Sequence, residues 1–352
     1  MSTKPIKFPQ DEQDHPYIIE WWYFNGHLQD ARKRQYAFMD CFFKADPKRV
    51  GLPVVKELPF KTVHFAHELL TDVSGRKFYP HFDHVAIPSR DSFTKPLLFI
   101  NYTNPLMVGG YLNMVIEETA PFEYHIKTNR LDLQLKATKP ALLVGGKGYL
   151  SMHGRNTYYY SLTNMKAEGE VLAGKKVVPV TGQAWMDHQW ANVKFNKDLW
   201  MWFSVQLDNK TEILCFEYSS ATKPRTLQAS LSYPNGKQKH ATDVKFTHTG
   251  QSWTSSKTKA SYPLGWRIEI PSRKVDLEVR PMMKNHEMIY GKINYWEGPM
   301  SVTGKFNGKK VGGKGFLELV GRPSRYNNVS MMRDLMKATV KVLPAELKKI
   351  LR

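Results

Sequence analysis

The chain has 352 residues and a formal net charge of +19, from 51 Lys and Arg against 32 Asp and Glu. Hydrophobic residues make up 41% and charged residues 24%, a globular composition that excludes global disorder. No run reaches the roughly 20 apolar residues that cross a bilayer, so no transmembrane helix is predicted. The length predicts two domains or one large β architecture.

The first 16 residues form a polar N-terminal segment. Residues 10–14 are all polar, so the segment lacks the apolar core of a signal peptide. We therefore expect a cytoplasmic protein. Period-two alternation or aromatic and β-branched runs then recur as far as Gly321, separated by turn signals and without helical periodicity between them. This pattern predicts an all-β antiparallel protein with two units, over residues 17–175 and 176–322. The runs cover residues 18–24, 36–43, 131–136, 157–162, 199–207, 213–218, 266–270 and 275–279.

The tail, residues 323–352, changes to helical spacing with apolar residues at Met332, Leu335 and Met336, and it is basic. The spacing predicts a short amphipathic C-terminal helix. Such a helix either packs over the fold or attaches peripherally to a membrane surface, and both interpretations stay open.

The excess of positive charge does not by itself indicate nucleic-acid binding. Lys and Arg occur one or two at a time in turns such as 145–148 and 307–310, and no DNA- or RNA-binding motif accompanies them. Cys41 and Cys215 lie in apolar runs, which predicts buried thiols rather than a disulfide scaffold or a thiolate metal site. We expect no nucleic-acid partner.

The motif Glu20-Trp-Trp-Tyr-Phe-Asn-Gly26 places four aromatic residues in succession. On a strand, Trp21, Tyr23 and Asn25 share one face, and the residues between them share the other. Both faces must therefore be covered by apolar material. A strand wedged between two packed layers and a wall of a ligand site fit this pattern equally well.

The motif Trp185-Met-Asp-His-Gln-Trp190 places Trp185, Asp187 and Gln189 on one face of a strand and His188 on the other. Asp187 and His188 are therefore not expected to pair. A carboxyl beside an indole is in an apolar setting, and burial raises a carboxyl pKa, which suits a general acid. An Asp that caps a turn or pairs with Arg is the structural alternative.

Two histidine pairs, His64 with His67 and His81 with His84, are spaced three residues apart. On a strand such residues point to opposite faces and cannot chelate one ion, so no metal site is predicted. His64 is instead a candidate polar group inside a cavity. The sequence has neither a phosphate loop nor a Gly-x-Ser-x-Gly elbow, which excludes kinase, nucleotide hydrolase and α/β-hydrolase functions.

Four blocks in order resemble the lipocalin-like family of carotenoid 1,2-hydratases and AttH-type proteins. They are residues 20–26, residues 182–190 followed by 200–203, residues 295–298 with 302–304, and residues 315–321. The resemblance implies two lipocalin-like β-barrel domains and an apolar ligand site. It implies that Asp187 is the proton donor. We expect no cofactor and no metal. The ligand-contacting residues expected on this basis are Trp21, Tyr23, Asn25, His64, Trp185, Gln189, Trp202 and Trp296.

Three functions stay open on this basis. The first is acid-initiated hydration, cyclisation or isomerisation of an apolar alkene, isoprenoid- or polyketide-like, with aromatic rings stabilising the cation. The second is a pericyclic cyclase of the Diels–Alder type, in which a shaped pocket only preorganises its substrate. The third is a carrier that binds a lipid or isoprenoid without catalysis.

Overall fold

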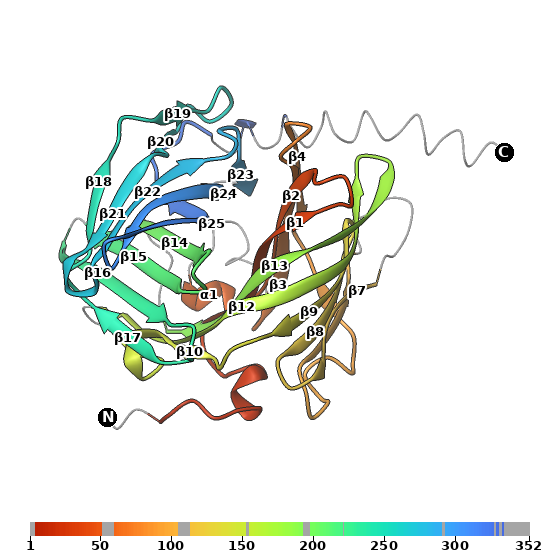
Figure 1. Cartoon of the computed structure of the whole chain (residues 1–352). Helices are drawn as coiled ribbons and strands as arrows, with labels where there is room; N and C mark the ends of the chain where they lie inside the picture. The colour runs from red at the N-terminus through yellow and green to blue at the C-terminus, as the bar shows by residue number, and fades with distance from the viewer. Residues whose placement is uncertain are drawn as a thin grey trace.

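The structure, a computed structural model, describes residues 4–50, 60–104, 113–152, 155–192, 198–220, 222–290, 293–326, 329–330 and 333. Within these ranges the protein consists of two large antiparallel sheets and one separate hairpin (Figure 1). Every described strand pair in both sheets is antiparallel, including the long ladders of β1 with β13 and of β24 with β25. The predicted all-β antiparallel class is confirmed.

The first sheet has thirteen strands, in the order β4-β3-β2-β1-β13-β12-β9-β8-β7-β6-β5, with β10 and β11 also pairing with β12. Its strands are β1 Ile19–Gln29, β2 Gln35–Ala45, β3 Val63–Asp72, β4 Lys77–Asp83, β5 Ile87–Pro88, β6 Phe99–Thr103, β7 Met114–Ala120, β8 Glu123–Lys127, β9 Leu131–Ala137, β10 Leu142–Leu143, β11 Tyr149–Met152, β12 Arg155–Ala173 and β13 Lys176–Ala191.

The second sheet has ten strands, in the order β17-β16-β15-β14-β25-β24-β22-β21-β18, with β23 also pairing with β24. Figure 1 shows it curled into a half-barrel. Its strands are β14 Leu199–Leu207, β15 Glu212–Ser220, β16 Lys223–Ser232, β17 Gln238–Ala241, β18 Lys245–His248, β21 Trp266–Ile270, β22 Val275–Pro281, β23 Glu287–Tyr290, β24 Ile293–Phe306 and β25 Lys309–Val320. The separate hairpin joins β19 Ser252–Thr254 to β20 Ser261–Pro263.

Helices are minor in the described residues. They are α1 Pro47–Val50 and the 3-10 turns Gln10–Glu12, Val144–Gly146 and Pro271–Arg273. None of the described helices is both long and apolar enough to cross a membrane. The helix expected in the tail falls outside the described residues, apart from Val329, Ser330 and Arg333, which are helical.

Three large apolar clusters and a small fourth one, around Ile18, Ala45, Val50 and Phe65, hold the sheets together, and period-two alternation decides which strand residue joins which cluster. In β9, Leu131, Leu133 and Leu135 are buried while Asp132 and Gln134 between them are not. The first cluster lies inside the first sheet and gathers residues as far apart in the strand order as Leu70 and Ile100, so this sheet curves around its own core. A second cluster lies inside the second sheet.

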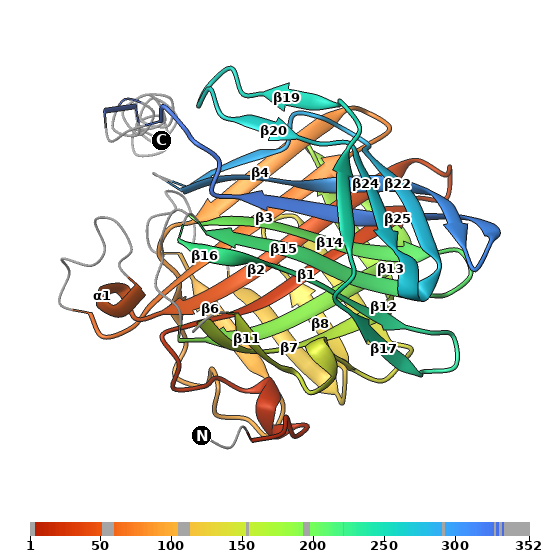
Figure 2. The same cartoon turned by 90° about the vertical axis from the view of Figure 1, so that its left-hand side faces the viewer.

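The third cluster lies between the two sheets and takes side chains from both, among them Tyr23 and Trp185 from the first and Trp202 and Phe316 from the second. Figure 2 looks onto the second sheet, whose strands β14, β15 and β25 lie over β1 to β3 and β13 of the first. The two sheets are therefore packed face to face across an apolar layer.

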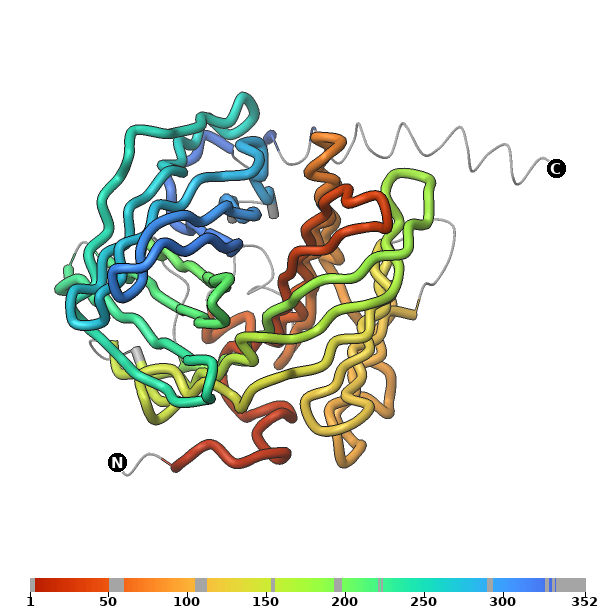
Figure 3. Tube along the Cα trace, viewed as in Figure 1, coloured from red at the N-terminus to blue at the C-terminus, as the bar shows by residue number. Residues whose placement is uncertain are grey.

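The chain passes from the first sheet to the second once, after β13 (Figure 3). The expected boundary at 175/176 falls in the hairpin between β12 and β13, and β13 lies in the first sheet with its neighbours β1 and β12. Sixteen residues, Lys176–Ala191, therefore pair with the first sheet although the sequence boundary assigns them to the second unit.

Candidate active site

The first half of the site is a row of cross-strand neighbours on the first sheet. Tyr23 of β1 lies opposite Asp187 of β13, and Asp187 lies opposite Ser161 of β12. On its other side Tyr23 lies opposite Cys41 of β2. Because directly opposite residues share a face, these side chains all point toward the second sheet. Trp185 and Asp187 join this face, whereas Met186 and Trp190 pack into the core of the first sheet, as the alternation predicted.

The second half is a matching row on the second sheet. Trp202 of β14 lies opposite Glu318 of β25, and Glu318 lies opposite Glu297 of β24. The rows meet at Tyr23, whose hydroxyl donates a hydrogen bond to the carboxyl of Glu297. Asn25 in turn donates to the Tyr23 oxygen at 3.1 Å. The interface thus brings two buried carboxyl groups, Asp187 and Glu297, and the partly buried Glu318 into one apolar layer.

Asp187 is bound by three donors, none of which carries a charge. Its Oδ2 accepts from the Tyr159 hydroxyl at 2.7 Å, and its Oδ1 accepts from Ser161 at 2.5 Å and from the Trp185 indole at 2.7 Å. The Trp202 indole donates to the Tyr159 oxygen at 2.9 Å, so the second sheet reaches Asp187 through Tyr159. Asp187 is 3% exposed. Its position is fixed from both sheets.

Burial dominates the acid–base properties of this cluster. It raises the pKa of Asp187 to about 7, although the bonds from Ser161, Trp185 and Tyr159 act in the opposite direction. Burial and the nearby charge of Asp187 raise the pKa of Glu318 to about 7. Burial and the facing Glu318 carboxyl raise the pKa of Glu297 well above its usual value. Proton exchange near neutral pH is therefore available to this group of carboxyls.

The structure brings most of the expected site residues together. The hydrogen bonds of the inter-sheet layer include Tyr23, Asn25, Trp185, Asp187 and Trp202, and two of these bonds cross between the sheets, from Tyr23 to Glu297 and from Trp202 to Tyr159. Trp21 and Gln189 share these faces. They lie opposite each other, one step along the same face from the Tyr23–Asp187 pair. Trp21 is partly buried and packs at the edge of the inter-sheet cluster. Its ring lies 6.5 Å from that of Phe43, centroid to centroid.

Two expected residues lie elsewhere. The His64 ring stacks on Phe42, with centroids 5.6 Å apart, on the face of β3 that points into the first sheet. Trp296 belongs to the core of the second sheet, where its indole donates to the Lys284 carbonyl at 2.7 Å. Strand alternation explains both positions, since His67 and Glu297 take the inter-sheet face instead. His67 Nδ1 lies 2.7 Å from the Tyr295 hydroxyl.

Four residues of the cluster were not singled out from the sequence: Tyr159, Ser161, Glu297 and Glu318. For Glu318 the sequence contained a signal that could have been used. Glu318 stands between Leu317 and Leu319, and a charged residue inside such a run requires a specific environment. For Tyr159 and Ser161 the sequence offers no comparable signal, because both residue types are ordinary in strands.

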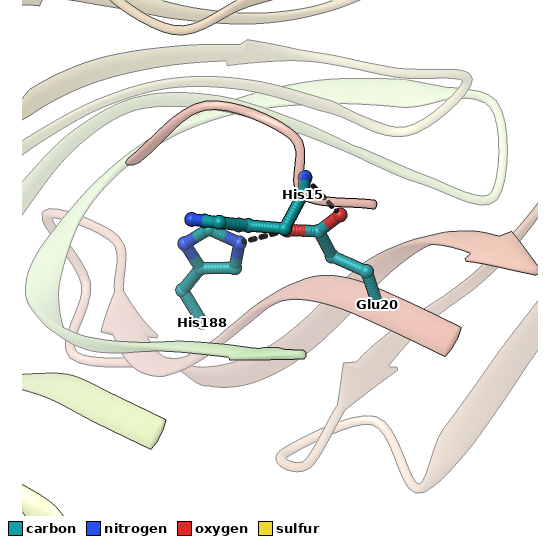
Figure 4. Close-up of side chains that lie close together, drawn as sticks. All are labelled: His15, Glu20 and His188. Atoms are coloured by element: carbon teal, nitrogen blue, oxygen red, sulfur yellow. Dashed lines mark hydrogen bonds and ion pairs between the residues drawn. The ribbon is translucent and has the colours of Figure 1, made fainter. Parts of the chain in front are cut away.

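The described residues contain one group with the side chains of a metal site: His15, Glu20 and His188 (Figure 4). Glu20 and His188 lie on β1 and β13, on the face opposite to Asp187. This group is therefore separated from the carboxyl cluster by the sheet itself.

Several known proteins are similar to this chain in sequence or in structure. The dehydratase asqC of Emericella nidulans is 23% identical over 201 residues, which make up 54% of this chain and 57% of that protein. The match thus spans little more than half of that relative. A crystal structure described as AttH from Nitrosomonas europaea has a TM-score of 0.71 and 22% identity, covering 91% of this chain and 98% of that one. Kievitone hydratase from Nectria haematococca also has a TM-score of 0.71, with 17% identity over 90% of this chain and 93% of that one.

At these identities the two solved structures establish the fold. The family is established by a separate match, because the model of the AttH-like family covers residues 1–322. That range contains both sheets and every residue of the carboxyl cluster. The chain belongs to the AttH-like family.

Proposed function

We propose that this protein is a hydro-lyase, which adds water to a carbon–carbon double bond of an apolar small molecule or removes it. The observation that carries the proposal is the Asp187 carboxyl, held by three uncharged donors inside an aromatic layer between the sheets. The names of two similar proteins, a dehydratase and a hydratase, support the same reaction class. In this proposal the sheets are two lipocalin-like units with the substrate between them.

Asp187 acts as the general acid. Its carboxyl transfers a proton to one alkene carbon, the π bond supplies the electron pair, and a cation forms at the neighbouring carbon. The aromatic faces of Tyr23, Trp185 and Trp202 stabilise this cation. The donors on both oxygens of Asp187 stabilise the carboxylate that remains, because each bond strengthens as negative charge develops.

Water completes the addition. Its oxygen attacks the cation, and its surplus proton passes to the Asp187 carboxylate, directly or through Glu318, so that the acid is restored. Dehydration follows the same steps in reverse, with Asp187 protonating the leaving hydroxyl and a carboxylate accepting the proton from carbon. Both directions need carboxyl groups that gain and lose protons near neutrality, which the raised pKa values of Asp187 and Glu318 provide.

The variant Asp187→Asn tests the proposal, because it keeps the volume of the side chain and removes the transferable proton. We expect turnover to fall by about 100-fold or more, the usual scale of general acid–base catalysis. Substrates are tertiary alcohols and trisubstituted alkenes of isoprenoid and polyketide type, assayed for incorporation of ¹⁸O from labelled water by mass spectrometry.

The control variant is Asp132→Asn, which removes a half-exposed carboxyl from β9 of the same sheet and should leave turnover unchanged. Nearly full hydration by Asp187→Asn would exclude Asp187 as the general acid. Cyclisation without ¹⁸O incorporation that persists in Asp187→Asn would identify a pericyclic cyclase, which needs a shaped pocket but no acid. Binding of these compounds without any turnover by the unmodified protein would identify a carrier.

A further inference from the structure

A second group of side chains converges on the face of β1 and β13 that points away from Asp187. Glu20 lies at the start of β1, His188 lies on β13, and His15 comes from the segment before β1. Glu20 Oε1 is 2.6 Å from His15 Nδ1 and 2.9 Å from His188 Nε2 (Figure 4). All three ligand-type atoms lie within 4.8 Å of one another.

We propose that His15, Glu20 and His188 form a binding site for a divalent transition-metal ion of the Zn²⁺ class. Two imidazole nitrogens and one carboxylate oxygen are the protein ligands of open tetrahedral zinc sites, in which water takes the fourth position. Imidazole selects Zn²⁺, Ni²⁺ or Cu²⁺ over Mg²⁺ and Ca²⁺, which prefer oxygen ligands.

Metal binding requires a lone pair on each ring nitrogen that now faces Glu20. His15 Nδ1 and His188 Nε2 must therefore be unprotonated, and each ring then carries its hydrogen on the other nitrogen. The surroundings accept that hydrogen: His15 Nε2 is 3.3 Å from Asp11 Oδ1, and His188 Nδ1 is 3.4 Å from the Tyr160 hydroxyl. Such outer partners, which orient a metal-binding histidine, are typical of zinc sites.

The second oxygen of Glu20 is held separately, which leaves Oε1 for the metal. Oε2 accepts from the backbone N–H of His15 at 2.8 Å and lies 3.5 Å from Lys44 Nζ. Lys44 is a positive charge that opposes a cation. It is itself bound to Asp14 at 2.5 Å and to the His15 carbonyl at 2.7 Å, so its charge is already compensated.

The ligands are rigidly placed and still accessible from one side. The His15 ring stacks on Trp190 with centroids 3.9 Å apart, and the His188 ring stacks on Trp22 at 4.8 Å. The side chains of Glu20 and His188 are completely buried, whereas that of His15 is 14% exposed. An ion would enter beside His15, and its binding would fasten the N-terminal segment to β1 and β13.

Zinc titration of the full chain, free of any histidine tag and stripped with a chelator, tests the site. We expect one equivalent of Zn²⁺ to bind, with a dissociation constant of about 1 µM or lower, measured by calorimetry. Co²⁺ in place of Zn²⁺ should give the visible absorption of a tetrahedral site. His15→Gln should weaken binding by about 100-fold or more, exceeding the 10- to 100-fold typical of losing an outer partner.

The matched control is His125→Gln, which removes a histidine of the same sheet whose Nε2 lies 2.8 Å from the Asp132 carboxylate. Its affinity for Zn²⁺ should equal that of the unmodified chain. If His15→Gln does not fold, Asp11→Asn replaces it, with an expected weakening of about 10-fold or more. If His15→Gln or Asp11→Asn binds Zn²⁺ as tightly as the unmodified chain, or if the unmodified chain does not bind one equivalent, the proposal is overturned. The three residues would then form a hydrogen-bonded group without metal.

Discussion

Asp187 and Glu20 are two buried carboxyl groups on adjoining strands, and their pKa values are shifted in opposite directions. Burial raises the pKa of Asp187 to about 7. Burial acts on Glu20 in the same direction, but hydrogen bonds and charge from His15 and His188 outweigh it and lower the pKa to about 2. The two groups lie on opposite faces of the β1–β13 pair.

The difference lies in the partners rather than in the burial. Asp187 meets hydroxyl and indole donors, which stabilise the carboxylate without supplying a charge. Glu20 meets two imidazoles and has Lys44 within 3.5 Å. A carboxyl among hydroxyl and indole donors keeps a transferable proton near neutral pH, whereas one that faces two imidazoles and an ammonium group stays ionised. The first arrangement suits catalysis, and the second suits a structural or metal-binding role.

The largest expected effect on stability is that of Glu20→Gln. It removes the buried carboxylate that His15, His188 and Lys44 face, and breaking such a buried charged cluster by removing one partner typically costs about 3–5 kcal/mol. The measurement is urea unfolding at pH 7 in the presence of a chelator, so that metal does not contribute. A loss below about 1 kcal/mol would show that the Glu20 cluster is not an ion pair in the folded protein.

The pH dependence of stability should have opposite signs for the two carboxyls. The folded state holds the Asp187 proton more tightly than the unfolded chain, where its pKa is near 3.8. Its contribution is therefore complete below about pH 3.8 and is lost as the pH rises through about 7. Glu20 contributes above its ordinary pKa of 4.5, and this contribution is lost as the pH falls through about 2.

Difference curves measure these two contributions. The free energy of unfolding of the unmodified chain minus that of Asp187→Asn should fall by about 2–4 kcal/mol between about pH 4 and pH 7. The same difference against Glu20→Gln should fall instead as the pH is lowered below about 4.5. Slopes of the same sign for both variants would contradict the comparison.

A smaller effect is expected from Tyr159→Phe. The change removes the donor to Asp187 Oδ2 and the acceptor for the Trp202 indole, at a cost of about 1–2 kcal/mol. Because the lost bond stabilised the carboxylate, the pKa of Asp187 should rise, and the pH profile of activity should shift upward with it. The control is Tyr158→Phe, whose ring stacks on Trp190 on the other face. Equal profiles for both variants would exclude Tyr159 as a partner of Asp187.

Sequence periodicity determined the fold class and the sharing of faces within a strand. Alternation correctly placed Trp185 with Asp187, and it separated Asp187 from His188 and His64 from His67. These are local properties, since the side-chain period of a strand depends only on neighbouring residues. The family resemblance added the role assigned to Asp187, which remains a proposal.

Only the tertiary structure decided which faces meet. Glu297 is 274 residues from Tyr23, and His188 is 168 residues from Glu20, yet each pair is in hydrogen-bond contact. It also assigned β13 to the first sheet, because cross-strand pairing with β1 is independent of where the chain turns. Periodicity predicts on which face of a strand a side chain lies. It does not predict what that face packs against, since this depends on strand order and on how the two sheets pack.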